Sequence, residues 1–440
     1  MAETMLLAST GRPILQSRSP DIFNSAFSKL GMEARYIRLA AWDASDAVRT
    51  AQEMNIIAFN VTSPFKEQML GLMDGLDKEA EKIGAVNTVS LKGGKLTGHN
   101  TDYFGAEAAL AHALGPLKGK RAVVLGAGGA AKAAIYALVS AGVLTTVINR
   151  TDEKAEKLAR QFGCACAPIK LAAKTIRGAD ILVSCIPTCD RVVPASALSP
   201  KLAVLDADYG QKTCLSADAK EAGCKIIDGR EWLLYQAVPR FEFITGKEPP
   251  IEEMRKALYA KRNGKKPNIA LIGFMGSGKS TVGKILARSL NYGFVDLDRE
   301  IELKKGKTVA EIFANEGERE FRRLERDEVS KMEGAGGKVF SCGGGAILEE
   351  SSRKTIRSNC IAIWLWASPQ TAVGRLGKDS ARRPLLEKGE GTPAEKAARI
   401  IAGRMPLYAE TCDMAISTEN RTPEQVAERI IYEIDNAFAN

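Results

Sequence analysis

Short apolar runs alternate with longer helical stretches along most of the chain. In its middle, Arg121–Leu125 and Leu144–Ile148 are largely apolar runs of the kind that forms buried parallel strands. Residues 130–142 between them are rich in alanine, which predicts a helix with Gly142 as its C-cap. The order of strand, glycine turn, helix and strand predicts a βαβ unit and therefore a parallel α/β fold.

The same alternation occurs on both sides of this unit. Upstream, the apolar runs Ile56–Phe59 and Ala85–Val89 lie among helical stretches such as Ile22–Leu30, which predicts a separate α/β lobe. Downstream, Ile251–Arg262 has the pattern of a helix. The short polar segment 263–267 contains a glycine and a proline and is the clearest linker. A new strand, Asn268–Ile272, begins a second βαβ pattern directly after it.

Composition and charge narrow the class of protein. The content of 45% hydrophobic and 26% charged residues is ordinary for a globular protein. The net charge of +9 favours anionic small-molecule ligands; without a dense basic stripe with interleaved aromatic residues, we expect no nucleic-acid partner. No apolar run approaches the roughly 18 residues of a membrane helix, so we expect no membrane partner.

The nine cysteines lack zinc-finger spacing, and the two histidines cannot complete a metal site. This pattern favours reduced thiols in a cytoplasmic protein.

A glycine-rich turn follows the first buried strand. Gly126-x-Gly-x-x-Ala131 matches the dinucleotide fingerprint, with alanine in place of the last glycine. Such glycines allow backbone N–H groups to approach a pyrophosphate, and the helix N-terminus adds a favourable dipole. The predicted contacts to the cofactor from this turn are Gly126, Ala127, Gly128, Gly129 and Ala130.

The end of the next strand indicates which dinucleotide binds. A site that prefers NAD carries a carboxylate there for the ribose 2′-hydroxyl, but this chain has Asn149, Arg150 and Thr151, with Lys154 one turn later. A guanidinium suits the 2′-phosphate of NADP through charge-assisted hydrogen bonds. We therefore predict NADP(H) as the cofactor, although Arg150 alone could be an ordinary surface arginine.

Four short segments upstream of this turn resemble the shikimate dehydrogenase family. They are Ser17-Arg-Ser19-Pro20, Asn60-Val-Thr-Ser-Pro-Phe-Lys66, Gly84-Ala-Val-Asn-Thr88 and Gly98-His-Asn-Thr-Asp102. The resemblance runs through residues 5–256 and implies NADPH-dependent reduction of 3-dehydroshikimate to shikimate. The segment Ser184–Asp190, expected near the nicotinamide, departs from the pattern of many family members.

The resemblance also assigns individual residues. Ser17 and Ser19 would hold the substrate carboxylate, and Lys66 and Asp102 would form the catalytic pair. The other predicted contacts to substrate or cofactor are Asn60, Thr62, Asn87, Tyr209, Gln236 and, for NADP, Gly229. The chemistry agrees, because hydride addition to a ketone builds an alkoxide that needs a proton donor and a positive charge.

A second phosphate loop follows the linker. Gly273-x4-Gly278-Lys279-Ser280 is a complete P-loop motif after the strand Ile269–Ile272. Its backbone N–H groups would hold the phosphates of ATP, with Lys279 on the β- and γ-phosphates and Ser280 on Mg²⁺. The predicted ATP contacts are Gly276, Ser277, Gly278, Lys279, Ser280 and Thr281.

The motifs after the P-loop resemble shikimate kinase across residues 268–435. They are Phe294-Val-Asp-Leu-Asp298, Glu320-Phe-Arg-Arg-Leu-Glu325, Ser341-Cys-Gly-Gly-Gly345, Arg382-Arg-Pro-Leu-Leu386 and Arg404-Met-Pro-Leu-Tyr408. The resemblance assigns Asp296 to Mg²⁺ and Arg383 to a lid over ATP. Around shikimate it places Asp298, Arg322, Gly344, Gly345 and Arg404. Phosphoryl transfer asks mainly for positioning and charge neutralisation, which these residues can supply.

The product of the first predicted reaction is the substrate of the second. We therefore expect a bifunctional enzyme that converts 3-dehydroshikimate to shikimate 3-phosphate with NADPH, ATP and Mg²⁺, as a monomer or homodimer. The expected domains are a substrate and catalytic lobe (1–105), a Rossmann NADP lobe (106–240), a returning C-terminal helix (241–262), the linker (263–267) and a P-loop kinase domain with a parallel sheet (268–440).

Two alternatives differ in class. In one, an NAD-dependent quinate or shikimate dehydrogenase is fused to a small-molecule kinase; Arg150 argues against it. In the other, the chain senses nucleotides and one domain is inactive. The intact pairs Lys66/Asp102 and Lys279/Asp298 argue against that interpretation.

Overall fold

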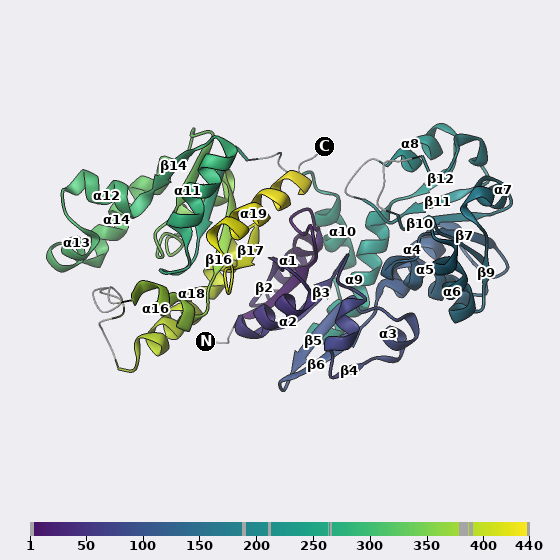
Figure 1. Cartoon of the computed structure of the whole chain (residues 1–440), viewed down its shortest axis with the longest axis horizontal. Coiled ribbons are helices and arrows are strands. Elements are labelled where there is room, and N and C mark those ends of the chain that lie inside the picture. The colour runs from purple at the N-terminus through teal and green to yellow at the C-terminus, as the bar shows by residue number, and fades with distance from the viewer. Residues whose placement is uncertain are drawn as a thin grey trace. The chain divides into compact units, whose positions relative to one another are not determined.

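The computed structural model describes residues 4–186, 191–209, 213–262, 264, 266–377, 386 and 390–437. These residues form two compact units (Figure 1). The first contains the residues up to Pro20, Glu33–Ile56 and the chain from Lys261 onward, and the second contains Asp21–Met32 and Ile57–Ala260. Each unit is therefore assembled from stretches that are separate in the sequence.

The first unit is built on a parallel sheet with the strand order β14-β15-β13-β16-β17-β2-β1. Its strands are β1 (Met5–Thr10), β2 (Ala34–Ala40), β13 (Asn268–Ile272), β14 (Gly293–Asp296), β15 (Lys338–Ser341), β16 (Cys360–Trp366) and β17 (Met414–Ser417). Two of these strands come from the N-terminal end of the chain. β17 pairs with β2 in the register Ala415 with Leu39 and Ile416 with Ala40.

Several helices of the first unit begin at side-chain caps. Thr308 and Glu311 form a capping box at one helix, and Thr392 and Glu395 form another ahead of Pro393. Asp296 caps a third helix through its side chain. The helices are α2 (Ala44–Glu53), α11 (Lys279–Leu290), α12 (Leu297–Lys305), α13 (Val309–Asn315), α14 (Gly317–Ser330), α15 (Glu350–Asn359), α16 (Pro369–Leu376), α18 (Pro393–Thr411) and α19 (Pro423–Ala437).

One hydrophobic core joins the N-terminal and C-terminal parts of this unit. Ile14, Leu15 and Ala40 pack in the same cluster as Leu271 and Ile430, and all of these side chains are almost completely buried. Burial of apolar surface is the main favourable term in folding. Ile14 and Leu15 are therefore part of the same core as the P-loop strand β13.

The second unit contains a six-stranded parallel sheet in the order β12-β11-β10-β7-β8-β9 within the described residues. Its strands are β7 (Arg121–Leu125), β8 (Leu144–Ile148), β9 (Ala165–Cys166), β10 (Ile181–Ser184), β11 (Ala203–Asp206) and β12 (Lys225–Ile227). From β7 the chain adds β8 and β9 on one side and β10, β11 and β12 on the other, so the strand order reverses between β7 and β10. Open α/β sheets bind ligands at the carboxyl ends of the strands at such a reversal.

A smaller set of strands completes the second unit. β3 (Ile56–Val61) and β6 (Lys95–His99) both pair antiparallel with β5 (Thr88–Lys92), and β4 (Gly75–Leu76) pairs with β6. The helices and 3₁₀ turns of the unit are α1 (Ser19–Lys29, whose first two residues belong to the first unit), α3 (Lys78–Ile83), α4 (Asp102–Leu114), α5 (Gly129–Ser140), α6 (Asp152–Phe162), α7 (Ala172–Arg177), α8 (Cys214–Glu221), α9 (Gly229–Thr245), α10 (Ile251–Tyr259), η1 (Gln68–Leu72), η2 (Ile169–Leu171) and η3 (Ala195–Ala197).

The predicted α/β class with parallel sheets and a βαβ unit is confirmed. The strands expected at 121–125 and 144–148 are β7 and β8, and they pair in parallel. The glycine expected to end the helix after β7 does so: α5 runs to Ser140, and Gly142 follows the cap residue Ala141 with φ +73° and donates its N–H to the Val139 carbonyl at 3.0 Å. The predicted end of the later helix was wrong, because α10 ends at Tyr259 and Ala260 leaves helical geometry with ψ 135°. Among the described residues, none of the helices has the length and apolarity that a bilayer crossing requires.

Candidate active sites

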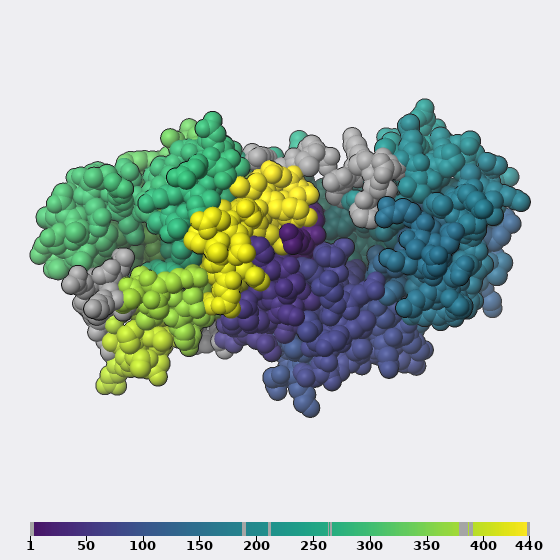
Figure 2. All heavy atoms as spheres, in the orientation of Figure 1, coloured from purple at the N-terminus to yellow at the C-terminus, as the bar shows by residue number. Residues whose placement is uncertain are grey.

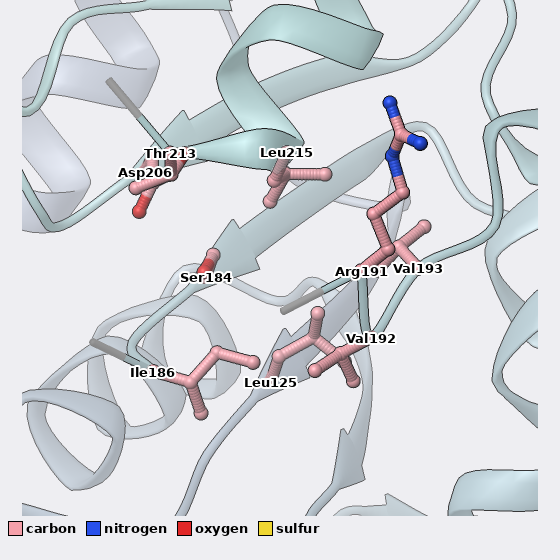
Figure 3. Close-up of a pocket in the computed structure, with 9 residues that line it drawn as sticks. All are labelled: Leu125, Ser184, Ile186, Arg191, Val192, Val193, Asp206, Thr213 and Leu215. Carbon is pink, nitrogen blue, oxygen red and sulfur yellow. The ribbon is translucent and has the colours of Figure 1, made fainter. Parts of the chain in front are cut away.

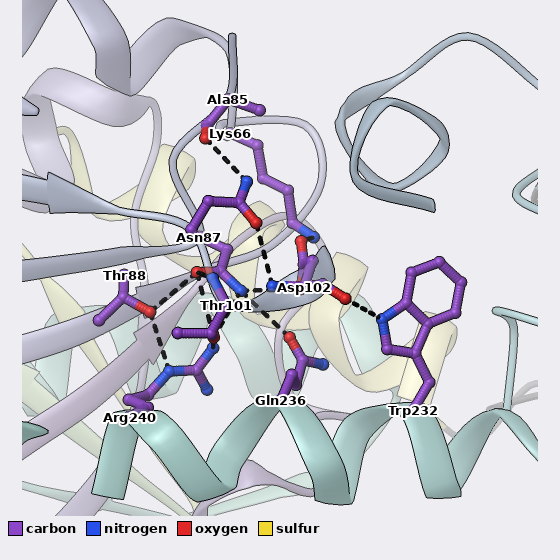
Figure 4. Close-up of polar contacts among 10 residues, drawn as sticks. Lys66, Ala85, Asn87, Thr88, Thr101, Asp102, Trp232, Gln236 and Arg240 are labelled. Carbon is purple, nitrogen blue, oxygen red and sulfur yellow. Dashed lines mark hydrogen bonds and ion pairs between the residues drawn. The ribbon is translucent and has the colours of Figure 1, made fainter. Parts of the chain in front are cut away.

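Lys66 and Asp102 form the central ion pair of the second unit (Figure 4). The distance from Lys66 Nζ to Asp102 Oδ2 is 2.5 Å. Asp102 is the first residue of α4 and only 2% exposed, and its backbone N–H donates to Asn100 Oδ1. Because the carboxylate lies at a helix N-terminus, the helix dipole also favours its negative charge. The predicted catalytic pair is therefore brought together.

Asn87 connects this pair to helix α9. Its Nδ2 donates to Asp102 Oδ1 at 2.8 Å and to Gln236 Oε1 at 3.2 Å. Its Oδ1 accepts from the backbone N–H of Thr101 at 2.9 Å. Three residues expected from the sequence at this site, Asn87, Asp102 and Gln236, thus share one hydrogen-bond network, which fixes the carboxylate in place.

Two members of the network were not predicted. Trp232 Nε1 donates to the backbone carbonyl of Asp102 at 2.8 Å, and Arg240 donates to Thr88 Oγ1 and Thr101 Oγ1. Trp232, Gln236 and Arg240 are four residues apart on α9, so all three lie on one face of the helix and point toward the site (Figure 4). That spacing is visible in the sequence and could have identified the two positions.

The glycine turn of the nucleotide sheet lies directly against Lys66. A Cβ placed on Gly129 would be 3.1 Å from Lys66 Cβ and Cδ. Gly126 has φ +112°, and a Cβ there would be 3.2 Å from the carbonyl oxygen of Cys185. Close approach and positive φ both require glycine at the start of the turn. Burial raises the pKa of the Cys185 thiol, so this thiol is neutral.

The predicted 2′-phosphate residues follow β8. Asn149 Nδ2 donates to the Thr151 carbonyl at 3.0 Å, and Thr151 precedes α6. Arg150 and Lys154 are exposed, and no ion pair of Arg150 occurs among the described residues. Arg150 and Lys154 are thus two exposed cations after β8, and positive charges there suit the anionic 2′-phosphate of NADP. Gly128 is the N-cap of α5, and backbone N–H groups at a helix N-terminus can bind a phosphate.

A small pocket lies at the carboxyl edge of the same sheet (Figure 3). Its walls include Leu125, Ser184 and Asp206, the last residues of β7, β10 and β11. Asp206 Oδ2 accepts from Thr213 Oγ1 at 2.5 Å, and burial raises the pKa of Asp206. Residues 187–190 of the unusual segment 184–190 lie outside the described residues.

The remaining predicted dehydrogenase residues lie in different places. Asn60 is buried near the end of β3, and its Oδ1 accepts no hydrogen bond among the described residues, so this atom is suited to bind a ligand hydroxyl. Thr62 follows β3 and is exposed. Gly229 begins α9 against the carbonyl of Asp206, which leaves no room for a Cβ. Tyr209 follows β11. Ser17 and Ser19 are buried residues of the first unit.

The P-loop of the first unit has the backbone that its motif requires. Gly273, Gly276 and Gly278 have φ of +143°, +78° and +93°, and a Cβ on Gly273 or Gly276 would overlap a carbonyl of Leu365 or Ala372. Lys279 Nζ donates to the carbonyls of Gly273 and Phe274 at 3.0 and 2.8 Å. The ammonium therefore lies inside the loop. Ser277 is buried beneath the loop, and Thr281 is exposed on α11.

The two predicted magnesium residues meet beside this loop. Ser280 Oγ donates to Asp296 Oδ2 at 2.5 Å, and Ser341 Oγ lies 3.1 Å from Ser280 Oγ. Hydroxyl and carboxylate oxygens are the donors that Mg²⁺ prefers, with water and phosphate completing its shell. The donor set fits the ion. Among the described residues no cluster of three or more histidine, cysteine or acidic side chains that could hold a metal ion occurs.

The predicted shikimate residues of the kinase line one pocket. Arg404 NH1 and the Tyr408 hydroxyl donate to the Gly344 carbonyl at 2.9 and 2.8 Å, and a Cβ on Gly345 would overlap the Arg322 guanidinium. The pocket is lined by Met275, Asp298, Val309, Phe313, Phe321, Arg322, Glu325, Gly344, Gly345 and Arg404. Two arginines, two acids and two phenylalanine rings suit a small polar carboxylate with an apolar ring face. Arg383 lies outside the described residues.

Glu325 is a further acid in this pocket, and only its place in the motif Glu320–Glu325 pointed to it. Its Oε2 accepts from Arg322 NH1 at 2.7 Å, and the side chain is 3% exposed. Burial raises the pKa of Glu325 to about 7, although the positive charge of Arg322 acts in the opposite direction.

Comparisons with known proteins identify the families that both parts of the chain match. The family models "Shikimate dehydrogenase substrate binding domain" and "Shikimate / quinate 5-dehydrogenase" match residues 10–89 and 108–204, and "Shikimate kinase" matches residues 275–435. The NADP(+) shikimate dehydrogenase of Halobacterium salinarum is 38% identical over 259 residues, which are 57% of this chain and 97% of the relative.

Solved structures show the same relationship. The shikimate dehydrogenase of Thermus thermophilus in complex with NADP(H) and shikimate has a TM-score of 0.53 and 33% identity, covering 58% of this chain and 98% of that one. A quinate dehydrogenase from Corynebacterium glutamicum in complex with NAD has a TM-score of 0.54 and 28% identity, covering 58% and 99%. The chain belongs to the shikimate dehydrogenase family and carries a shikimate kinase domain in its C-terminal part. The predicted fusion of an NADP-dependent dehydrogenase with a kinase is confirmed.

The raised pKa of Glu325 predicts a pH dependence of stability. The folded protein favours the neutral acid, so this contribution to stability is complete below the ordinary pKa of 4.5 and is lost as the pH rises through about 7. Glu325→Gln cannot ionise, so its unfolding free energy relative to the wild type should increase between about pH 5 and about pH 8, by on the order of 1–3 kcal/mol. Thermal unfolding across this range measures the difference.

The matched control for this experiment is Glu318→Gln, which removes the other, half-exposed carboxylate partner of Arg322. Its difference from the wild type should not change over the same pH range. Parallel stability curves for Glu325→Gln and the wild type would contradict the raised pKa.

Proposed function

We propose that residues 1–262 reduce 3-dehydroshikimate to shikimate with NADPH and that residues 268–440 transfer the γ-phosphoryl group of ATP to shikimate. The observation that carries the first half is the Lys66–Asp102 pair lying against Gly129 of the dinucleotide turn. The proposed division by function is 1–105, 106–240, 241–262, the linker 263–267 and 268–440. The compact units follow other bounds, because residues up to Pro20 and Glu33–Ile56 group with the chain from Lys261 onward.

Lys66 acts as the proton donor in the reduction. NADPH, when bound, supplies the hydride to the carbonyl carbon. Lys66 Nζ donates a proton to the carbonyl oxygen as it gains negative charge, and Asp102 holds the ammonium in place at 2.5 Å. The product is an alcohol, and the lysine regains its proton from water.

Polar side chains around this pair hold the substrate. Asn60, with its unpartnered buried oxygen, and Asn87 and Gln236, with their shared network, are suited to the ring hydroxyls. Thr62 and Tyr209 add further contacts, as the family resemblance suggests. Ser17 and Ser19 bind the substrate carboxylate through their hydroxyls.

The residues proposed to bind NADP form two groups, one at the pyrophosphate and one at the adenosine 2′-phosphate. The turn Gly126, Ala127, Gly128, Gly129 and Ala130 approaches the pyrophosphate, and Asn149, Arg150, Thr151 and Lys154 hold the adenosine end with its 2′-phosphate. Gly229 allows α9 to begin against β11 beside the nucleotide sheet. The exposed cation Arg150 favours NADP over NAD, the cofactor of the quinate dehydrogenase relative.

The kinase residues position the substrate and neutralise charge. Arg322 and Arg404 bind the shikimate carboxylate beside Gly344 and Gly345, and Asp298 orients the attacking hydroxyl and accepts its proton. Gly276, Ser277, Gly278, Lys279 and Thr281 hold ATP. Ser280 and Asp296 hold Mg²⁺, which when bound offsets phosphate charge, and Arg383 closes over ATP.

We also propose that the enzyme is cytoplasmic, a monomer or homodimer, and without nucleic-acid or membrane partners. The cysteines of the described residues are free thiols, which suits a reducing compartment.

The test of the function is a two-stage assay on the whole chain. With 3-dehydroshikimate and NADPH, absorbance should fall as shikimate forms; addition of ATP and Mg²⁺ should then yield shikimate 3-phosphate and ADP. Hydride transfer without phosphate transfer would contradict the kinase half. Failure of the first stage with intact phosphorylation of added shikimate would contradict the dehydrogenase half.

Lys66→Met should lower the kcat of the dehydrogenase by about 10²- to 10⁴-fold, because the proton donor is lost. The kinase rate should not change. Lys132→Met is the control, because Lys132 is a neighbouring lysine that pairs with Glu67 at 2.9 Å. Steady-state kinetics of both reactions measures the effect, and a loss below tenfold would contradict the role.

Arg150→Gln should raise the KM for NADPH by roughly 10- to 100-fold, because charge-assisted hydrogen bonds to the 2′-phosphate are lost. The KM for NADH should stay the same, since NADH lacks this phosphate. Lys157→Gln, another exposed cation on α6, is the control. Equal losses with both cofactors would show that Arg150 does not read the 2′-phosphate.

A further inference from the structure

A buried ion pair on α19, the last helix of the kinase region, binds the backbone of residues 11–17. Glu433 Oε2 accepts from the N–H groups of Ile14 and Leu15 at 2.7 and 2.9 Å. Its Oε1 accepts from Arg429 NH2 at 2.7 Å, and the same nitrogen donates to the Gly11 carbonyl at 3.2 Å. Both side chains are 0% exposed. The pair therefore anchors three backbone groups of this loop.

Apolar packing holds the same loop against the same helix. Ile14 and Leu15 lie in one core cluster with Val426, Ile430 and Ile434 of α19. The space-filling view shows atoms of the C-terminal helix beside atoms of the N-terminal residues (Figure 2). A buried ion pair is costly to desolvate unless its remaining hydrogen bonds are made. Here the loop backbone makes three of them, to Glu433 Oε2 and Arg429 NH2, while Arg429 NH1 has no hydrogen-bond partner among the described residues. Loss of the loop contacts would therefore leave the pair still less satisfied.

The loop ends at the serines that we assign to the substrate carboxylate. The Ser17 carbonyl accepts from Arg38 Nε at 2.9 Å and from Arg262 NH2 at 2.6 Å, which fixes the end of the loop. Arg38 NH1 in turn donates to the Asp413 carbonyl at 3.2 Å, just before β17. The Ser17 hydroxyl accepts from the Ser19 N–H at 3.4 Å, at the start of α1. The Ser17 carbonyl is thus held by Arg262, which directly precedes the linker, and by Arg38 of β2, which itself contacts the kinase region at Asp413.

We propose that Glu433 is a positioning residue for the dehydrogenase: through the loop 11–17 it places Ser17 and Ser19 for the carboxylate of 3-dehydroshikimate. The inference rests on the proposed function of these serines. The Halobacterium salinarum relative is covered over 97% of its length by 57% of this chain, which leaves it no room for a counterpart of α19. The proposed role is therefore specific to a chain that carries the kinase region.

The test compares full-length variants in both reactions. Glu433→Ala should raise the dehydrogenase KM for 3-dehydroshikimate by about tenfold or more and change kcat by less than about threefold, because binding of the carboxylate is lost rather than proton transfer. The KM for NADPH and the kinase KM for ATP should stay within about twofold. Glu433→Gln keeps one acceptor oxygen and should restore part of the affinity. Unchanged KM values in Glu433→Ala would overturn the proposal.

A matched control separates positioning from general destabilisation. Glu419 is also a buried acid of the kinase region, and it accepts from the Ser368 N–H and the Thr371 hydroxyl but contacts no residue of 11–17 in any described hydrogen bond. Glu419→Ala should leave the KM for 3-dehydroshikimate unchanged. A rise equal to that of Glu433→Ala would overturn the proposal. If Glu433→Ala does not fold, the double variant Arg429→Met/Glu433→Leu replaces the pair by apolar groups of similar size and is subject to the same expectations.

Hydrogen exchange at the amides of Ile14 and Leu15 does not depend on catalysis. It shows whether Glu433 holds the loop, separately from whether the loop places the substrate. In the wild type both amides should be protected, and in either Glu433 variant that lacks the acceptor they should exchange at least roughly tenfold faster. Faster exchange with an unchanged KM would mean that the loop is held but does not place the substrate, which overturns the inference. A wild type that does not reduce 3-dehydroshikimate would overturn the proposed function itself, and the positioning role with it.

Discussion

The parallel pairing of β17 with β2 is the contact on which the organisation of this chain depends. Ala415 pairs with Leu39 and Ile416 with Ala40, and all four side chains are buried. A strand edge carries backbone groups that must be paired, covered or solvated, and this pairing satisfies two edges at once. It also brings Ile14 and Leu15 into the core of the P-loop sheet. The first unit therefore contains the kinase fold and the N-terminal strands together.

Both active sites use the same physical arrangement. Parallel strands end at one edge of a sheet, glycine turns there leave backbone N–H groups for phosphate, and charged side chains from neighbouring helices complete the site. In the second unit, Gly129 lies against Lys66, and in the first, Lys279 lies within its own loop. The chemistry differs because one site presents a lysine–aspartate pair and the other a serine–aspartate pair for Mg²⁺.

Short sequence patterns were sufficient to predict individual strands and helices. The strands at 121–125, 144–148 and 268–272 and the helix between the first two depend on short apolar runs and glycine positions, and these predictions were close to the structure. The pairing of β2 with β17 joins strands that are far apart in the sequence, so no local sequence pattern could predict it. The same holds for Glu433, which looks like one more acid on an amphipathic helix until its contact with Ile14 is seen. Trp232 and Arg240 were missed although they lie four residues before and after the predicted Gln236, a spacing that places all three on one face of α9.

Native-state hydrogen exchange at increasing denaturant tests this organisation most directly, because it reports which segments open together. The account predicts that peptides covering 5–17 and 34–40 open in the same step as the kinase strands 268–272 and 360–366. They should not open in the step that exposes 121–125 and 181–184 of the second unit. Opening of 5–17 and 34–40 together with the nucleotide sheet, while the kinase strands stay protected, would contradict a shared core of the N-terminal strands and the kinase.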